Sequence, residues 1–158
     1  MFFSKKTGLT KKNDGFGRVY LFRVTLDDGS IIHKVGMTNS DRATDRMFEV
    51  LRSFFHSYRY SPKCELRKDK KVLVPRLVEK HLHGLLDDLK YTFSKKFDGS
   101  TEFFQDLDEE SFIEYLNDFS YNELLKTTQM KECDLVAIRK ALDAEKPKKP
   151  ESEDKLPF

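Results

Sequence analysis

The sequence predicts a protein of the α+β class, in which a small, mainly antiparallel sheet is flanked by helices and followed by a C-terminal helical extension. A hairpin pattern comes first, helical and short strand patterns then alternate, and only helical patterns follow residue 104. Charged residues make up 35% of the 158-residue chain, yet 14 Phe and 6 Tyr supply enough large apolar surface for a core.

The first element is a β-hairpin. Residues 18–26 read RVYLFRVTL and residues 31–36 read IIHKVG, and both stretches are rich in β-branched and aromatic residues. Asp28-Gly29 between them is a dipeptide typical of a tight hairpin turn. A further strand is expected near residues 63–67, but Pro62 and the charge run at residues 67–71 leave its limits open.

Two longer helices flank that strand. In DRATDRMFEVLRSFF, Met47, Val50, Leu51 and Phe54 have the i, i+3, i+4, i+7 spacing of an amphipathic helix. Pro75 then stands at the first turn of a second helix, RLVEKHLHGLLDDLK. Its expected buried stripe consists of Val78, Leu82, Leu85 and Leu89.

Four segments follow from these patterns. Residues 1–17 form a flexible basic lead-in, and residues 18–104 form the core. Residues 105–145 form the helical extension, in which Asp108 caps one helix. Residues 146–158 contain proline and charge with almost no apolar content, so a disordered tail is expected there.

Composition limits which kinds of binding partner and which cellular compartment are expected. The net charge is only +2, so nucleic-acid binding would require a local basic patch. No apolar run is long enough for a membrane span, and the N-terminus lacks the apolar region of a secretory signal. Cys64 and Cys133 form no paired motif and indicate free thiols in a reducing cytoplasm.

One basic stretch stands out as a substrate-binding candidate. It combines cationic residues with two tyrosines just before them: Lys63, Arg67, Lys68, Lys70 and Lys71, with Tyr58 and Tyr60. Such a stretch can follow a phosphate backbone and stack on bases. The alternative is a charged, solvated loop without a ligand.

Five local motifs occur in a fixed order along the core. They are Tyr20 in VYLFRV, KVGMT at residues 34–38, an arginine in DRATDRM, Glu79 followed by His83 in VEKHLHGLL, and GSTEFF at residues 99–104. In this order they resemble the GIY-YIG nuclease superfamily, and most closely its phage-type branch. That branch carries a lysine, here Lys34, at the position of the second signature tyrosine.

The resemblance implies a metal-dependent endonuclease that hydrolyses DNA phosphodiesters and is encoded by a phage or mobile element, acting in the host cytoplasm. It implies a single Mg²⁺ or Mn²⁺ ion held by Glu79 and a tyrosine, Tyr20, that acts as a base or orients the attacking water. An arginine contacts the phosphate, and either Arg46 or Arg42 fits, since the two lie one helical turn apart.

Each candidate also has a purely structural explanation. Glu79 would be a solvated charge on a helix flank, and Tyr20 a core tyrosine. Lys34 either lowers the pKa of the Tyr20 phenol or holds the scissile phosphate, and the structural alternative is an exposed strand lysine. His83 either orients the carboxylate or a metal-bound water, or simply packs. Glu102 is expected to close the core beside these residues.

Two further functions stay open. The chain has no match for an asparagine found late in many members, and residues 106–114 are acidic. These features favour a catalytically inactive module that binds nucleic acid or a host protein, with the C-terminal helices as a host-protein or homodimer surface. A third possibility is an interaction protein without nuclease ancestry, whose Tyr20, Lys34, Arg46 and Glu79 would scatter over different faces. DNA and RNA, duplex, branched or single-stranded, remain open as substrates.

Overall fold

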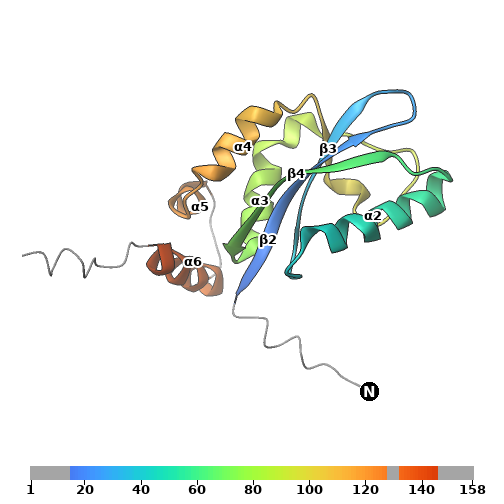
Figure 1. Ribbon diagram of the computed structural model, residues 1–158. Coiled ribbons are helices and arrows are strands. Elements are labelled where there is room, and N and C mark those ends of the chain that lie inside the picture. Colours follow the sequence, from blue (N-terminus) through green and yellow to red (C-terminus); the bar gives the residue numbers. More distant parts are fainter. Residues whose placement is uncertain (1–14, 128–131, 146–158) are drawn as a thin grey trace, which may run out of the picture. The chain divides into compact units, whose positions relative to one another are not determined.

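A four-stranded antiparallel sheet forms the centre of the first part of the chain (Figure 1). The computed structural model describes residues 15–127 and 132–145. The strands are β2 (Phe16–Thr25), β3 (Ile31–Thr38), β4 (Lys63–Leu73) and β5 (Phe103–Gln105), in the order β4-β2-β3-β5. All three neighbouring pairs are antiparallel, which confirms the predicted α+β class.

The helices follow the predicted patterns. They are α2 (Ala43–Tyr58), α3 (Pro75–Leu85), α4 (Glu109–Asn117), α5 (Asn122–Thr127) and α6 (Glu132–Glu145), with short 3₁₀ turns η1 (Asp87–Leu89) and η2 (Ser100–Glu102). The chain divides into two units, one that ends at Asp118 and one that begins at Phe119, so α4 belongs to the same unit as the sheet.

The two faces of the sheet are covered by different helices. Because side chains alternate along a strand, Tyr20 and Phe22 lie on one face, where they pack with Val50 and Phe54 of α2. Helix α3 buries Leu82 and its neighbours and contacts β3 and β2. Figure 1 shows α2 and α3 on opposite sides of the sheet.

Strand β4 continues well beyond the predicted residues 63–67. It pairs with β2 along its whole length, from Thr25↔Lys63 to Phe16↔Leu73, with one irregularity between Leu21 and Phe22. The charge run therefore lies in an edge strand instead of a loop. An edge strand tolerates charged side chains because one of its sides faces solvent.

The buried stripe predicted for the second helix is correct only in its first half. Val78 and Leu82 are fully buried, but the side chain of Leu85 is 55% exposed. The α-helix ends at Leu85 and the chain tightens into η1. A tighter helix changes the angle between successive residues, and Leu89 is only half-buried.

A single carboxylate joins α4 to the sheet. Asp108 caps α4 as predicted, accepting a hydrogen bond from the Ser111 amide at 3.2 Å. Glu109 beside it accepts hydrogen bonds from Arg23 at 2.9 Å, Arg67 at 3.0 Å and His33 at 2.9 Å. Burial alone would raise the pKa of Glu109, but these three bonds lower it to about 2. Arg67 therefore has a structural partner.

The second unit is helical over the residues described. Leu124 of α5 and Ile138 and Ala141 of α6 are buried, and the Phe119 and Tyr121 rings lie 5.4 Å apart. Most of the predicted lead-in and all of the predicted tail, together with the Cys133 side chain, lie outside the described residues. Within residues 15–127 and 132–145, no helix has the length and apolar character needed to cross a membrane.

Candidate active site

Tyr20 and Lys34 come together across the hairpin. Tyr20 lies opposite Gly36 and Lys34 opposite Phe22, so the two side chains are diagonal neighbours on one face of the sheet. The Lys34 Nζ atom lies 5.4 Å from the centre of the Tyr20 ring. Both side chains are completely buried, which excludes the alternative of an exposed strand lysine. A lysine is almost never fully buried unless it is paired.

Gly36 explains why the KVGMT motif contains a glycine. A Cβ atom at this position would lie 2.4 Å from the Tyr20 hydroxyl oxygen and 2.9 Å from Lys34 Nζ. The backbone of Gly36 thus forms the wall against which both functional groups rest. Any side chain here would displace them.

Substitution of Gly36 by Ala is expected to lower the free energy of unfolding by about 1–3 kcal/mol, the usual cost of overpacking. Gly84→Ala is the matched control, because a Cβ atom on Gly84 meets nothing within 4 Å. In a helix that exchange is expected to be neutral or stabilising. Denaturant unfolding measures both variants, and equal midpoints for Gly36→Ala and wild type would contradict the packing described.

Arg46 is the arginine that reaches this pair. Its Nη1 atom lies 2.9 Å from Asp98 Oδ2 and 3.0 Å from Glu49 Oε1, and its side chain is 22% exposed. It also lies close enough to the Tyr20 hydroxyl to affect the pKa of that group. Arg42, by contrast, is 73% exposed and pairs with Asp45. Of the two candidate arginines, the structure brings only Arg46 to the cluster.

A tight turn before β5 lies directly over both cations. Gly99 has a φ of +85°, which favours glycine, and a Cβ atom on it would lie 3.0 Å from Lys34 Cε and 3.6 Å from Arg46 Nη2. Asp98 on one side of this glycine bonds Arg46, and Glu102 on the other bonds Lys34 Nζ. The FDGS sequence indicated only a turn, so the role of Asp98 was not predicted.

Glu79 completes the cluster from α3. Its side chain is only 17% exposed. Burial raises the pKa of Glu79 to about 7, and the nearby Glu102 carboxylate raises it as well, while Lys34 and Arg46 act in the opposite direction. Two carboxylates therefore face one another beside two cations. A solvated glutamate on a helix flank would show neither the burial nor the shift.

His83 holds α3 against the sheet. Its Nε2–H group donates to the Val35 carbonyl oxygen at 2.6 Å, and the ring centre lies 5.4 Å from that of Phe104. Burial lowers the pKa of His83, which keeps the ring neutral. Its Nε2 atom is 3.9 Å from Glu79 Oε2. The Nε2 proton is already bonded to a backbone carbonyl oxygen. This geometry therefore favours a packing role for His83 over orientation of the Glu79 carboxylate or of a metal-bound water.

Tyr20 has a buried hydroxyl group without a hydrogen-bond partner among the described residues. Burial raises the pKa of Tyr20 well above its ordinary value, and the Arg46 guanidinium beside it only partly opposes that shift. The phenol is therefore neutral, and its hydroxyl group is able to donate one hydrogen bond and to accept another. An unsatisfied buried hydroxyl is costly, and it is the kind of group that a bound water or phosphate oxygen would satisfy.

The predicted basic stretch is largely engaged elsewhere. Arg67 pairs with Glu109, Lys70 Nζ donates to the Leu116 carbonyl oxygen at 2.7 Å, and Lys71 Nζ lies 4.8 Å above the Phe16 ring. Lys63 is exposed at the start of β4, and Lys68 is half-buried opposite Leu21. The two tyrosines of the stretch, Tyr58 and Tyr60, pack on Phe54, so they are not free to stack on bases.

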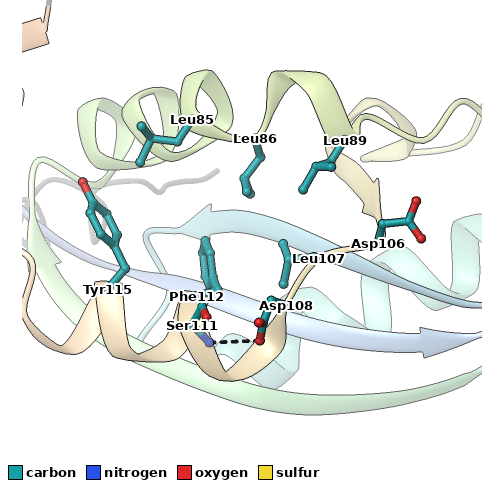
Figure 2. Close-up of a pocket in the computed structure, with 9 residues that line it drawn as sticks. All are labelled: Leu85, Leu86, Leu89, Asp106, Leu107, Asp108, Ser111, Phe112 and Tyr115. Carbon is teal, nitrogen blue, oxygen red and sulfur yellow. Dashed lines mark hydrogen bonds between the residues drawn. The ribbon is translucent and has the colours of Figure 1, made fainter.

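An apolar hollow in this unit is separate from the cluster. Figure 2 shows its lining, which comes from the end of α3, η1 and α4, with Leu86, Leu107 and Phe112 turned toward one another. Its volume is about 320 Å³. None of Tyr20, Lys34, Arg46 or Glu79 lines it, so the hollow is not where the candidate chemistry lies.

The model of the T5orf172 domain matches residues 17–120, which is more than half of the chain. The chain belongs to the T5orf172 domain family. The T5orf172 domain is a phage-associated, nuclease-like domain, and its match covers the sheet from the second residue of β2 onward, together with α2, α3 and α4. Searches among curated proteins and among solved structures each found no significant match. The cluster described above lies entirely within the T5orf172 domain.

Proposed function

We propose that this T5orf172 domain is a metal-dependent endonuclease that hydrolyses DNA phosphodiesters by GIY-YIG-type chemistry, encoded by a phage or mobile element. One observation carries the proposal. Tyr20, Lys34, Arg46 and Glu79 come from β2, β3, α2 and α3, and their charges and polar groups act on one another, with Tyr20 and Lys34 buried and Arg46 and Glu79 partly exposed. An interaction protein without nuclease ancestry would have no reason to bring these four groups together.

The carboxylates fit a hard divalent cation. Within the described residues no group of three or more His, Cys, Asp or Glu side chains is arranged around a metal position. Mg²⁺ and Mn²⁺ do not require one, since Mg²⁺ is commonly held by one or two carboxylates and keeps several waters. Glu79 would hold the ion, with Glu102 beside it. Bound there, the ion would neutralise charge that develops on the phosphate and the leaving oxygen.

The other side chains bind and orient. The Arg46 guanidinium stays charged at any working pH and presents a fork that matches two phosphate oxygens. Burial lowers the pKa of Lys34 and the paired Glu102 carboxylate opposes that shift. In its protonated form Lys34 would add a second positive charge where water is excluded, which strengthens the attraction for the phosphate. The Tyr20 phenol is placed to hold the attacking water by a hydrogen bond. Its raised pKa means that it gives up a proton only with help from a neighbouring cation.

A catalytically inactive binding module is the second candidate. It is favoured by the pairing of both cations with carboxylates, Lys34 with Glu102 and Arg46 with Asp98. Incubation of the purified chain with plasmid, branched and single-stranded DNA, with Mg²⁺, Mn²⁺ or EDTA, separates the two. Cleavage that requires the metal supports the nuclease. DNA binding without cleavage of any substrate under any of these conditions would overturn it in favour of the binding module.

Asp98 competes with a substrate phosphate for Arg46, so Asp98→Asn is expected to tighten DNA binding. The carboxylate is 58% exposed, and an exposed ion pair contributes about 0.2–1 kcal/mol, which corresponds to a 1.5- to 5-fold lower Kd. Fluorescence anisotropy with a labelled DNA measures it. Asp45→Asn is the control, because Asp45 pairs with Arg42 outside the cluster. Unchanged or weaker binding by Asp98→Asn would contradict a phosphate site at Arg46.

A further inference from the structure

The outer face of α2 carries two exposed phenylalanines interleaved with two arginines. Phe48, Arg52 and Phe55 are spaced by four and three residues, so they lie along one side of the helix, and Arg59, where α2 ends, lies over the Phe55 ring. Phe48 is 59% exposed and Phe55 is 43% exposed. Single exposed apolar residues are ordinary, but two aligned rings on the side opposite the core are not explained by folding. We call these four residues the α2 stripe.

The core does not need these rings. Helix α2 buries Ala43, Val50 and Phe54 against the sheet, and these residues occupy the other side of the helix. Exposure of these two rings to water is therefore unfavourable in free energy, and the rings do not contribute to packing of the core. A surface of this kind is consistent with a binding partner that covers it.

The charge of the α2 stripe identifies the chemistry of that partner. Neither the Arg52 nor the Arg59 guanidinium forms an ion pair with any residue that the structure describes, and Arg59 lies 5.7 Å above the Phe55 ring. The carboxylates of the helix, Asp45 and Glu49, are bonded instead to Arg42 and Arg46. The stripe thus presents flat apolar rings flanked by free cations, which matches bases joined by phosphates.

We infer that the α2 stripe binds DNA with unpaired bases, so that single-stranded or branched DNA is the substrate class of the proposed nuclease. Seven residues of helix separate Phe48 from Phe55, or about 10 Å at 1.5 Å per residue. Stacked bases rise about 3.4 Å per step, so the two rings are about three steps apart. Base pairing in a duplex hides the faces of the bases, whereas unpaired bases are free to stack on a ring.

The inference rests on the proposed function in that Arg46 lies on the same helix and faces the catalytic cluster. A helix with its side chains is about 10–12 Å in diameter, so a strand held at Arg46 reaches the stripe after a short passage around α2. The stripe would then select the unpaired strand, while Arg46 and Glu79 act on the phosphate.

The double variant Phe48→Ala/Phe55→Ala in the full chain tests the inference. Fluorescence anisotropy in EDTA compares a labelled 20-nucleotide poly-dT strand with a 20-base-pair duplex. Loss of two stacking platforms is expected to weaken single-strand binding at least tenfold and duplex binding less than twofold. Phe48→Tyr/Phe55→Tyr should restore single-strand binding because the rings are retained. Ile31→Ala is the control, since Ile31 is 51% exposed but lies on β3.

Each other result overturns the inference. The double alanine variant could bind single-stranded DNA as wild type does, or it could lose the same factor in affinity for both DNAs. Either result would show that the two rings do not stack on unpaired bases. If the molar mass measured by light scattering falls from dimer to monomer in the variant, the α2 stripe is an interface between two copies instead. Binding in EDTA is independent of cleavage. A chain that binds single strands through the stripe but never cuts would refute the proposed function and not this site.

Discussion

Replacement of Glu79 by Gln is expected to reduce DNA cleavage by about 100- to 1,000-fold while the fold remains intact. Glutamine keeps the shape of the side chain but removes the charge that would hold the cation, and loss of one electrostatic stabiliser commonly costs 10²- to 10³-fold. Initial rates with Mn²⁺ and Mg²⁺ measure the change. Glu114→Gln, on the exposed side of α4, is the control and should cleave like wild type.

The same variant carries an independent signature in the metal-free protein. Burial and the Glu102 carboxylate raise the pKa of Glu79 to about 7 from its ordinary 4.5. A raised pKa means that the native state prefers the neutral form, so its stabilising contribution is complete below pH 4.5 and is lost as the pH rises through about 7. Glu79→Gln stays neutral. In EDTA at pH 8 it should unfold at a higher denaturant concentration than wild type, and a lower midpoint would show that Glu79 has a structural role.

Lys34→Met is expected to lower cleavage at least about 100-fold without loss of stability. The lysine ammonium is fully buried, and its removal takes away a charge that acts on the phosphate where water is excluded. Methionine has a similar length and no charge, and exchange of a buried ion for a well-packed apolar side chain is often neutral or stabilising. The partner, Glu102, is 28% exposed and is able to turn toward water.

If Lys34 has only a structural role, Lys34→Met is expected to change stability and not cleavage. Breaking its ion pair with Glu102 would then lower the free energy of unfolding, and cleavage per folded molecule would stay unchanged. Steady-state cleavage and denaturant unfolding on the same preparation distinguish the two cases. Lys126→Met controls for the introduction of an apolar side chain, because Lys126 is 68% exposed on α5.

The elements that depend on local periodicity were predictable, and the structure brings together four of the candidate residues, although their roles in a site stay a prediction. The hairpin and α2 follow from alternation and from helical spacing within short windows. The meeting of Tyr20, Lys34, Arg46 and Glu79 was expected from the order of the motifs. The choice of Arg46 over Arg42 required the structure, because one helical turn separates the two and only tertiary packing selects between them.

What the sequence did not reveal depends on contacts between distant segments. The length of β4 was hidden because an edge strand pairs through its backbone and can carry a run of charged side chains. Arg67 looked free until α4 brought Glu109 to it. Tyr58 and Tyr60 looked available for bases, but both pack on Phe54, and the exposed rings are those of Phe48 and Phe55.

Strand β5 is only three residues long, and its shortness leaves the rest of the β3 edge to α3. It pairs with β3 from Ile32 to Lys34 and no further, because the chain before Phe103 is wound into η2. Beyond that point the edge of β3 is left to α3, whose His83 takes the Val35 carbonyl. An insertion that lengthened β5 toward its start would extend the pairing of β5 with β3 past Val35. The added strand would take the place of α3 and move Glu79 away from Lys34. Relatives are therefore expected to tolerate insertions in the hairpin turn at Gly29 far better than in the few residues before β5.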